Sequence, residues 1–516
     1  MIRLYTRIRQ LTGWRRATLA LAAGLGAALS MPPLNLWPLL FVAVPVLLLL
    51  LESARSRPAA FFSGWLFGLG YFIFAFHWIG FAFFVDAATY LWMMPFAVGG
   101  LAAAMAIYWG LAALVVNIAG WRGLSLVCGF AATLAIAEWL RGALFTGFPW
   151  AAPGLAVDGM GAVAQSASLI GMTGLTLLIM LWAGLPLVLA QRGRAAAFTL
   201  FLLLPLSWGY GAYRLADAVH ADVPGVRLRL VQPNISQDQK WREGNARKIF
   251  DTLLSLSASP GETRPTHVIW PESAVPFLID EIPEVRVEIR NALGGAVLMT
   301  GAIRRDASAQ VDAPIFNSII TFDGEAQVVA RYDKWRLVPG GEFLPLGWLL
   351  EPLGFRKVVT VPGSFTSGPG PVTLAIPGAP PVAMLICYEV IFPNGLIDPE
   401  RRPGWIVNVT NDGWFGNSTG PWLHLAQTRA RAIEQGLAIA RVANTGISAV
   451  IDPYGRIPAK LSVNLQGVLD AALPASLQAT PYGIFGDAIP GLMSLLLVAF
   501  AQGWHRKSIA FNSQLP

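Results

Sequence analysis

The chain has 516 residues, of which 55% are hydrophobic and only 13% are charged. This balance excludes an ordinary soluble enzyme, since such proteins carry about 25% charged residues, and it indicates an integral membrane protein. The formal net charge of +7 does not indicate a nucleic-acid partner, because the sequence contains neither a basic recognition helix nor a row of interleaved basic and aromatic residues. We therefore expect no nucleic-acid partner.

Long apolar stretches fill residues 1–215 and return near the C-terminus. Their lengths approach or exceed the roughly 20 residues that a helix needs to cross a bilayer. We predict about eight transmembrane helices, seven within 1–215 and the eighth at 484–502, followed by a tail at 503–516. The first also resembles a secretory signal peptide, but we expect it to be retained. The predicted spans are 14–31, 34–52, 59–84, 89–119, 123–140, 163–190, 196–213 and 484–502.

The basic residues of the short connections predict the orientation in the membrane. On the other side of the membrane from the N-terminus, the short loops and span ends offer only Arg141 and Arg214. The positive-inside rule then places both termini in the cytoplasm and exports residues 220–480. The basic residues on the N-terminal side are Arg3, Arg7, Arg9, Arg15, Arg16, Arg55, Arg57, Arg122, Arg192, Arg194, Arg506 and Lys507.

Residues 220–480 follow a different pattern, in which short β-rich runs alternate with amphipathic helical stretches. About 250 residues of this kind are typical of one α/β domain with its own core. Apolar residues at helical spacing around Phe250 and around Ala426 predict two of its helices. The predicted strands are 226–232, 267–270, 296–300, 318–322, 328–332, 382–386, 405–409 and 438–451.

Cys387 ends one of these strand-like runs, and Glu272 and Lys334 follow two others. A thiol, a carboxylate and an ammonium are the groups needed to activate a sulfur nucleophile and to stabilise the oxyanion of acyl transfer. Cys128 lies in a predicted span, so we expect no disulfide. A free cysteine is more often a small buried hydrophobe, and the functional interpretation therefore depends on the two charged neighbours.

The residue types suggest a role for each group. We expect Glu272 to accept the thiol proton, because a thiol with a pKa near 8.5 is mostly protonated at neutral pH. We expect Lys334 to stabilise the oxyanion, together with the backbone N–H of Tyr388. Glu342 and Glu389 are supporting candidates.

Two alternatives stay open for Glu342 and Glu389. Each could orient Lys334 or move a proton, or each could form an ordinary ion pair that holds a loop, with Arg431 or Arg441 as its partner.

Four further residues are substrate-binding candidates: Trp241, Asn411, Trp414 and Trp348. An Asn-Asp-Gly turn would also explain the segment around Asn411 without any ligand. Trp348 lies in the apolar stretch 343–350, which we expect to rest with Phe365 against the membrane and to admit an acyl chain. The five histidines show no metal-ligand spacing, so we expect no metal and no cofactor.

Three segments carry a resemblance to a known family: Trp270-Pro-Glu-Ser, Tyr332 to Glu342, and Leu385-Ile-Cys-Tyr-Glu389. In this order they resemble the Glu, Lys and Cys signatures of the nitrilase (carbon-nitrogen hydrolase) superfamily. With the predicted spans around them, the whole chain resembles the membrane-embedded members of that superfamily, the apolipoprotein N-acyltransferases. Further matching segments are Val231 to Trp241, Asn408 to Gly416 and Arg429 to Glu434.

The resemblance implies a four-layer α-β-β-α sandwich on the periplasmic side of the bacterial inner membrane. It also implies a ping-pong reaction that completes lipoprotein maturation. Cys387 takes an acyl chain from a glycerophospholipid, with phosphatidylethanolamine as the implied donor, and passes it to the α-amine of the N-terminal diacylglyceryl-cysteine of an apolipoprotein. We expect a monomer. The alternatives are a membrane-tethered amidase for small amides or nitriles, and a transporter or lipid-binding scaffold with a silent domain.

Overall fold

The computed structural model describes residues 2–191, 193–216, 218, 221–242, 244–306, 313–357 and 365–512. The chain divides into two compact units, and each is described here by itself. The first comprises Met1–Gly80, Met94–Ala218 and Ala479–Pro516, and the second comprises Phe81–Met93 and Val219–Gln478.

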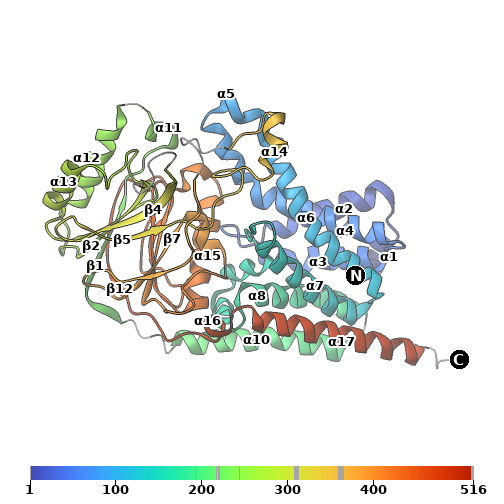
Figure 1. The fold of residues 1–516 in the computed structure, drawn as a ribbon. Helices are drawn as coiled ribbons and strands as arrows, with labels where there is room; N and C mark the ends of the chain where they lie inside the picture. Colours follow the sequence, from blue (N-terminus) through green and yellow to red (C-terminus); the bar gives the residue numbers. More distant parts are fainter. Residues whose placement is uncertain are drawn as a thin grey trace. The chain divides into compact units, whose positions relative to one another are not determined.

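The first unit is helical (Figure 1). Its α-helices are α1 (Ile2–Arg9), α2 (Gly13–Ala28), α3 (Leu40–Glu52), α4 (Arg57–Phe76), α6 (Met94–Ala119), α7 (Gly123–Ala143), α8 (Ala167–Ala183), α9 (Leu185–Ala190), α10 (Arg194–Ala216), α16 (Pro481–Phe485) and α17 (Ala488–Asn512). Its 3-10 helices are η1 (Trp37–Leu39) and η4 (Pro153–Ser166). A third, η2 (His77–Phe84), follows α4 directly, and its residues from Phe81 on belong to the second unit.

Six apolar helical stretches in the described residues are long enough to cross a membrane. They are Arg57–Phe84, Ala87–Ala119, Gly123–Ala143, Pro153–Ala190, Arg194–Ala216 and Ala488–Ala510, and they overlap six of the eight predicted spans. The other two predictions, 14–31 and 34–52, fall on shorter helices, α2 and the stretch Trp37–Glu52. The predicted span 89–119 is split between the two units. Helix α6 begins only at Met94, and residues 81–93 belong to the second unit.

A buried ion pair lies on α7. Arg141 pairs with Glu138 one turn away, and both side chains are buried. Trp109 of α6 donates its indole N–H to Glu138 Oε1 at 2.7 Å. This pairing satisfies groups that would be costly to leave alone inside a membrane.

The second unit contains two six-stranded sheets. The first has the order β12-β1-β2-β3-β4-β5, with β1, β2 and β3 parallel, and the second has the order β11-β10-β9-β8-β7-β6, with β7, β8 and β9 parallel. The first sheet holds β1 (Asp222–Gln232), β2 (His267–Trp270), β3 (Val297–Arg305), β4 (Ile315–Phe322), β5 (Val328–Asp333) and β12 (Gly467–Pro474). The second holds β6 (Thr373–Leu374), β7 (Val382–Ile386), β8 (Trp405–Thr410), β9 (Ile439–Ala443), β10 (Ser448–Ile451) and β11 (Ala459–Leu461).

The two sheets face each other across an apolar core. Alternate residues of the strands point inward, and the core includes Leu230, Ile269, Met299, Met384, Val407 and Ala440. Helices α12 (Asn245–Ser257) and α13 (Pro283–Leu293) cover the outer face of the first sheet through a second apolar cluster (Figure 1). Helix α15 (Gly420–Gln435) packs against β9 of the second sheet. The predicted four-layer α-β-β-α architecture is therefore confirmed.

Short helices complete this unit: α5 (Ala87–Tyr90), η3 (Leu91–Met93), α11 (Gln237–Lys240), α14 (Gly347–Leu350), η5 (Glu351–Leu353), η6 (Cys387–Ile391) and η7 (Asp412–Phe415). One strand prediction was wrong. Residues 438–451 form two antiparallel strands, β9 and β10, and not one. The Asn444-Thr-Gly turn between them separates the two strands, since Asn and Gly favour turns over strand interiors. A Cβ on Gly446 would lie 2.2 Å from Asp412 Oδ2.

Candidate active site

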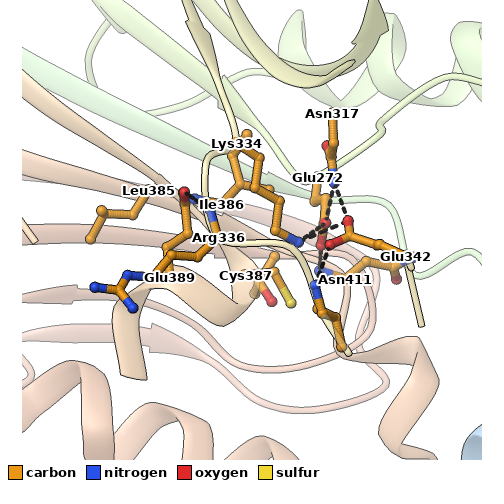
Figure 2. Close-up of polar contacts among 12 residues, drawn as sticks. Glu272, Asn317, Lys334, Arg336, Glu342, Leu385, Ile386, Cys387, Glu389 and Asn411 are labelled. Carbon is orange, nitrogen blue, oxygen red and sulfur yellow. Dashed lines mark hydrogen bonds and ion pairs between the residues drawn. The ribbon is translucent and has the colours of Figure 1, made fainter. Parts of the chain in front are cut away.

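The three principal candidates each follow the end of a strand. Glu272 lies two residues after β2, Lys334 directly follows β5, and Cys387 directly follows β7. β2 and β7 are parallel strands within their sheets, whereas β5 is an edge strand that pairs antiparallel with β4. The structure places the three groups in one cluster (Figure 2). The sequence prediction that these residues meet agrees with this geometry.

Cys387 has an unusual backbone conformation. Its φ is +50°, in the left-handed region that non-glycine residues rarely adopt, and the 3-10 helix η6 starts at this residue. Such a conformation costs on the order of 1–3 kcal/mol and persists only where the surroundings enforce it. After the sharp turn from β7 into η6, Cys387 lies beside the charged cluster (Figure 2), and the charges of Glu272 and Lys334 act on its thiol.

Lys334 lies between two carboxylates. Its ammonium donates to Glu342 Oε1 at 2.9 Å and lies 3.6 Å from Glu272 Oε1, and all three side chains are nearly completely buried (Figure 2). Its backbone N–H donates to the carbonyl of Asn317 at 2.8 Å, which extends the pairing of β5 with β4 by one residue. Glu342 is fixed in turn, because the backbone N–H of Val338 donates to its Oε2 at 2.8 Å.

Two asparagines orient Glu272. The side chain of Asn317, on β4, donates to Glu272 Oε1 at 2.8 Å and to Glu342 Oε1 at 3.1 Å. The backbone N–H of Asn411 donates to Glu272 Oε2 at 2.9 Å. Asn411 was predicted as a substrate-binding residue, whereas Asn317, which directly precedes the predicted strand 318–322, was missed.

The electrostatic environment sets the resting state of the thiol. Burial and the negative charge of Glu272 raise the pKa of Cys387, and the positive charge of Lys334 only partly opposes them. Burial alone would lower the pKa of Lys334, but the charges of Glu342 and Glu272 more than reverse this and raise it. Both shifts favour a neutral thiol beside a charged ammonium, so the thiol needs a base when it attacks.

The hydrogen bonds of Glu389 are separate from those that join Lys334, Glu342 and Glu272. Its Oε1 accepts from the hydroxyl of Tyr332 at 2.8 Å and from the backbone N–H of Trp335 at 2.9 Å, and its Oε2 accepts from the backbone N–H of Ile386 at 2.7 Å. Burial raises the pKa of Glu389 to about 7, against the backbone hydrogen bond from Ile386 and the charge of Lys334. These contacts tie the Lys334 loop to the end of β7.

The two arginines considered as partners of these glutamates have other partners. Arg441 binds Asp412 at 2.8 Å and Arg431 binds Glu434 at 2.8 Å, so the alternative in which these arginines pair with Glu342 or Glu389 was wrong. Spacing along the sequence could not reveal which buried carboxylate each arginine would meet.

Tyr388, the neighbour of Cys387, is buried. Its ring packs edge-on against the ring of Phe392, with 5.0 Å between the two ring centroids.

The remaining candidates differ in exposure. Trp241 is 44% exposed and Trp348 is 78% exposed, whereas Trp414 is half-buried on η7. The structure brings Asn411 into the site, where its backbone N–H donates to Glu272. The role of these tryptophans in substrate binding stays a prediction.

A second residue that sequence reasoning missed lies behind Glu272. Lys240, on α11, is buried and donates from its ammonium to the backbone carbonyl of Glu272 at 3.2 Å. Burial lowers the pKa of Lys240 to about 8, although the charge of Glu272 opposes this. Gln237, one turn earlier, accepts from the side-chain amide of Asn411 at 2.7 Å. Both residues lie in the segment 231–241 that carried the family resemblance.

Sequence comparisons add independent information. The sequence profile described as "Apolipoprotein N-acyltransferase N-terminal domain" matches residues 23–185, and the profile described as "Carbon-nitrogen hydrolase" matches residues 227–482. Three curated relatives carry the name apolipoprotein N-acyltransferase. The protein of Rhodopseudomonas palustris is 42% identical over 94% of this chain and 94% of its own length. That of Bradyrhizobium diazoefficiens is 43% identical over 96% of this chain and 98% of its own length. That of Caulobacter vibrioides is 39% identical over 96% and 95%.

These relatives match along nearly the whole chain, so the helical unit and the two-sheet unit both fall within the similarity. Together with the six long apolar helices, they make this a multi-pass membrane protein. The chain belongs to the apolipoprotein N-acyltransferase family.

Proposed function

We propose that this protein transfers a fatty acyl chain from a glycerophospholipid, through a thioester on Cys387, to the α-amine of the N-terminal diacylglyceryl-cysteine of an apolipoprotein. The family membership supports the activity. The observation that carries the mechanism is a buried thiol at a strained strand end, beside a carboxylate and an ammonium that are themselves 3.6 Å apart.

In the first half-reaction, Glu272 removes the thiol proton as the sulfur attacks the ester carbonyl. The new S–C bond leaves a negative oxygen, which Lys334 and the backbone N–H of Tyr388 stabilise; one such donor contributes about 3 kcal/mol. The ester C–O bond then breaks, and Glu272 returns the proton to the departing glycerol oxygen. The products are a lysophospholipid and a thioester on Cys387.

In the second half-reaction, the neutral α-amine attacks the thioester carbonyl. Its pKa near 7.7–8.0 leaves a useful neutral fraction at pH 7. The N–C bond forms and the C–S bond breaks, and Glu272 transfers the amine proton to the leaving sulfur. The products are an N-acylated lipoprotein and the free thiol. Water has to be excluded from the thioester, and the nearly complete burial of the charged side chains is consistent with that requirement.

We further propose that the termini are cytoplasmic, that residues 220–480 are periplasmic in the bacterial inner membrane, that phosphatidylethanolamine is the donor and that the protein acts as a monomer. The distribution of basic residues supports the orientation. A cysteine introduced at exposed Lys248, on α12, should react with a membrane-impermeant maleimide in intact spheroplasts; reaction only after lysis would contradict this orientation.

The reaction is tested with the purified full-length protein. It is incubated in detergent with phosphatidylethanolamine that carries a labelled acyl chain and with a diacylglyceryl-cysteine peptide. We expect label on the peptide α-amine with the wild type, none with Cys387→Ala, and none when the peptide amine is acetylated. Turnover of small water-soluble amides without peptide labelling would contradict the proposal and favour the amidase alternative.

A further inference from the structure

A second buried network contacts Cys387 from α15, apart from the cluster of Glu272, Lys334 and Glu342. His424, on α15, has no exposed surface, and its Nε2 lies 3.2 Å from the backbone carbonyl oxygen of Cys387. A carbonyl oxygen can only accept, so Nε2 carries the hydrogen and donates it. His424 is thus bonded to the backbone of the residue whose φ of +50° shapes the strand end.

The ring of His424 is fixed from its other side. Its Nδ1 lies 2.9 Å from Asp412 Oδ1 and 3.0 Å from Nη2 of Arg441. The same Nη2 donates to Asp412 Oδ2 at 2.8 Å. Burial and the positive charge of Arg441 lower the pKa of His424, whereas the charge of Asp412 and its hydrogen bond with the ring oppose this shift. An oriented second partner of this kind fixes the tautomer and the ring plane of a histidine.

The network continues beyond His424. The hydroxyl of Thr410, the last residue of β8, donates to Asp412 Oδ1 at 2.9 Å. Residues from β8, η7, α15 and β9 therefore form one network that reaches the backbone carbonyl of Cys387 through His424.

We propose that His424, oriented by Asp412 and Arg441, is a positioning residue for the nucleophile: it binds the Cys387 carbonyl and thereby holds the left-handed backbone that directs the sulfur toward Glu272 and the ester carbon. The inference rests on acyl transfer at Cys387. His424 does not touch the substrate. A displacement of the nucleophile by about 1 Å can cost about 100-fold in rate, so the loss of this bond should slow acylation without weakening lipid binding.

Three variants separate positioning from general support of the fold. His424→Leu removes the bond, His424→Gln can place an amide N–H where Nε2 lies, and His424→Asn reaches only the Nδ1 position. His267→Leu is the matched control, because His267 is also buried and its Nε2 lies 2.9 Å from a backbone carbonyl, that of Pro377. Two rates are measured at the Cys387 peptide of the full-length protein: thioester formation from phosphatidylethanolamine and alkylation by iodoacetamide.

We expect the maximal acylation rate to fall about 10- to 100-fold in His424→Leu and His424→Asn, with an unchanged KM for phospholipid. His424→Gln should recover most of the rate, and His267→Leu should stay within about 3-fold of the wild type. Alkylation should follow the same order. The proposal is overturned if His424→Leu acylates at the wild-type rate, if His424→Gln is as slow as His424→Asn while both are folded, or if all three unfold while His267→Leu does not.

The two assays fail in different ways. If the wild type forms no thioester but iodoacetamide still ranks the variants in the expected order, the proposed acyl transfer fails and the positioning role stands. If the wild type forms the thioester and the variants match it in both assays, the positioning role fails and the acyl transfer stands.

Discussion

Asn317 donates a hydrogen bond of 2.8 Å to Glu272, the carboxylate proposed to accept the thiol proton. The same amide donates to Glu342, so one side chain on β4 holds the two carboxylates that pair with the Lys334 ammonium (Figure 2). The arrangement lets three charges coexist in a buried space, since each carboxylate has donors other than the ammonium.

Replacing Asn317 by Leu should lower the maximal acylation rate by about 10- to 100-fold, because both carboxylates lose a donor and Glu272 is no longer held in place. The KM for phospholipid should not change, since the side chain of Asn317 is buried and donates to the two carboxylates. Single-turnover thioester formation measures the effect. The control is Thr321→Val, which alters another buried polar side chain of β4, and an equal loss in that variant would contradict the specific role of Asn317.

Glu389 should make the stability of the protein depend on pH. Its pKa rises from 4.5 in the unfolded chain to about 7 in the folded one, so between these values the folded state holds a proton that the unfolded state has lost. The contribution of Glu389 to stability therefore falls as the pH rises from about 4.5 to about 7, by about 3 kcal/mol in total.

Thermal unfolding in detergent at pH 5 and pH 7 tests this sign. Glu389→Gln cannot titrate, so its stability relative to the wild type should improve between pH 5 and pH 7, whatever the loss caused by the changed hydrogen bonds. A difference between variant and wild type that stays constant over this range would show that Glu389 is ionised throughout.

The pair on α7 predicts a non-additive pair of substitutions. Glu138→Leu leaves the buried guanidinium of Arg141 without its carboxylate, which costs about 3–5 kcal/mol. The double variant Glu138→Leu/Arg141→Leu removes both charges and should be less destabilised than the single one. Unfolding midpoints of the two variants and the wild type decide this, and a double variant that is less stable than the single one would contradict the account.

An exposed apolar surface is formed by Leu346, Trp348, Leu349 and Leu353, on and beside α14 and η5. Large exposed apolar patches mark interaction sites, and a lipid surface is the partner that the proposed reaction requires. Trp348→Asp/Leu349→Asp should lower kcat/KM for phospholipid in vesicles about 10-fold, since burial of each such side chain is worth more than 1 kcal/mol. Val287→Asp, at an exposed apolar site on α13, is the control. Equal losses in both variants would exclude a specific lipid contact.

Much of the site could be predicted because its chemistry lies at strand ends. Glu272, Lys334 and Cys387 each follow an apolar β-rich run, and such ends gather at one edge of an α/β fold. Asn317 and His424 could not be assigned a role in the same way. The pattern places His424 in a helix and Asn317 directly before the predicted strand 318–322, but periodicity does not say which distant backbone or carboxylate a buried polar group will meet.

The helical unit shows a similar division between what was predictable and what was not. Hydropathy located the long spans, since only apolar composition and length matter for that prediction. It could not fix the ends near Met94, where residues of similar apolarity belong to a different compact unit. The partners considered for Arg431 and Arg441 were also wrong. Arg431 pairs with Glu434 one helical turn along, and Arg441 pairs with Asp412, which is distant in the sequence.

The central claim is that Cys387 carries the acyl group, and intact-mass spectrometry of the full-length protein tests it most directly. After incubation with phosphatidylethanolamine of one defined acyl chain and no acceptor, the wild type should gain the mass of one acyl group, located on the Cys387 peptide and released by hydroxylamine. Cys387→Ala should gain nothing. An unchanged wild-type mass, or an acyl group on another residue that persists in Cys387→Ala, would contradict the account.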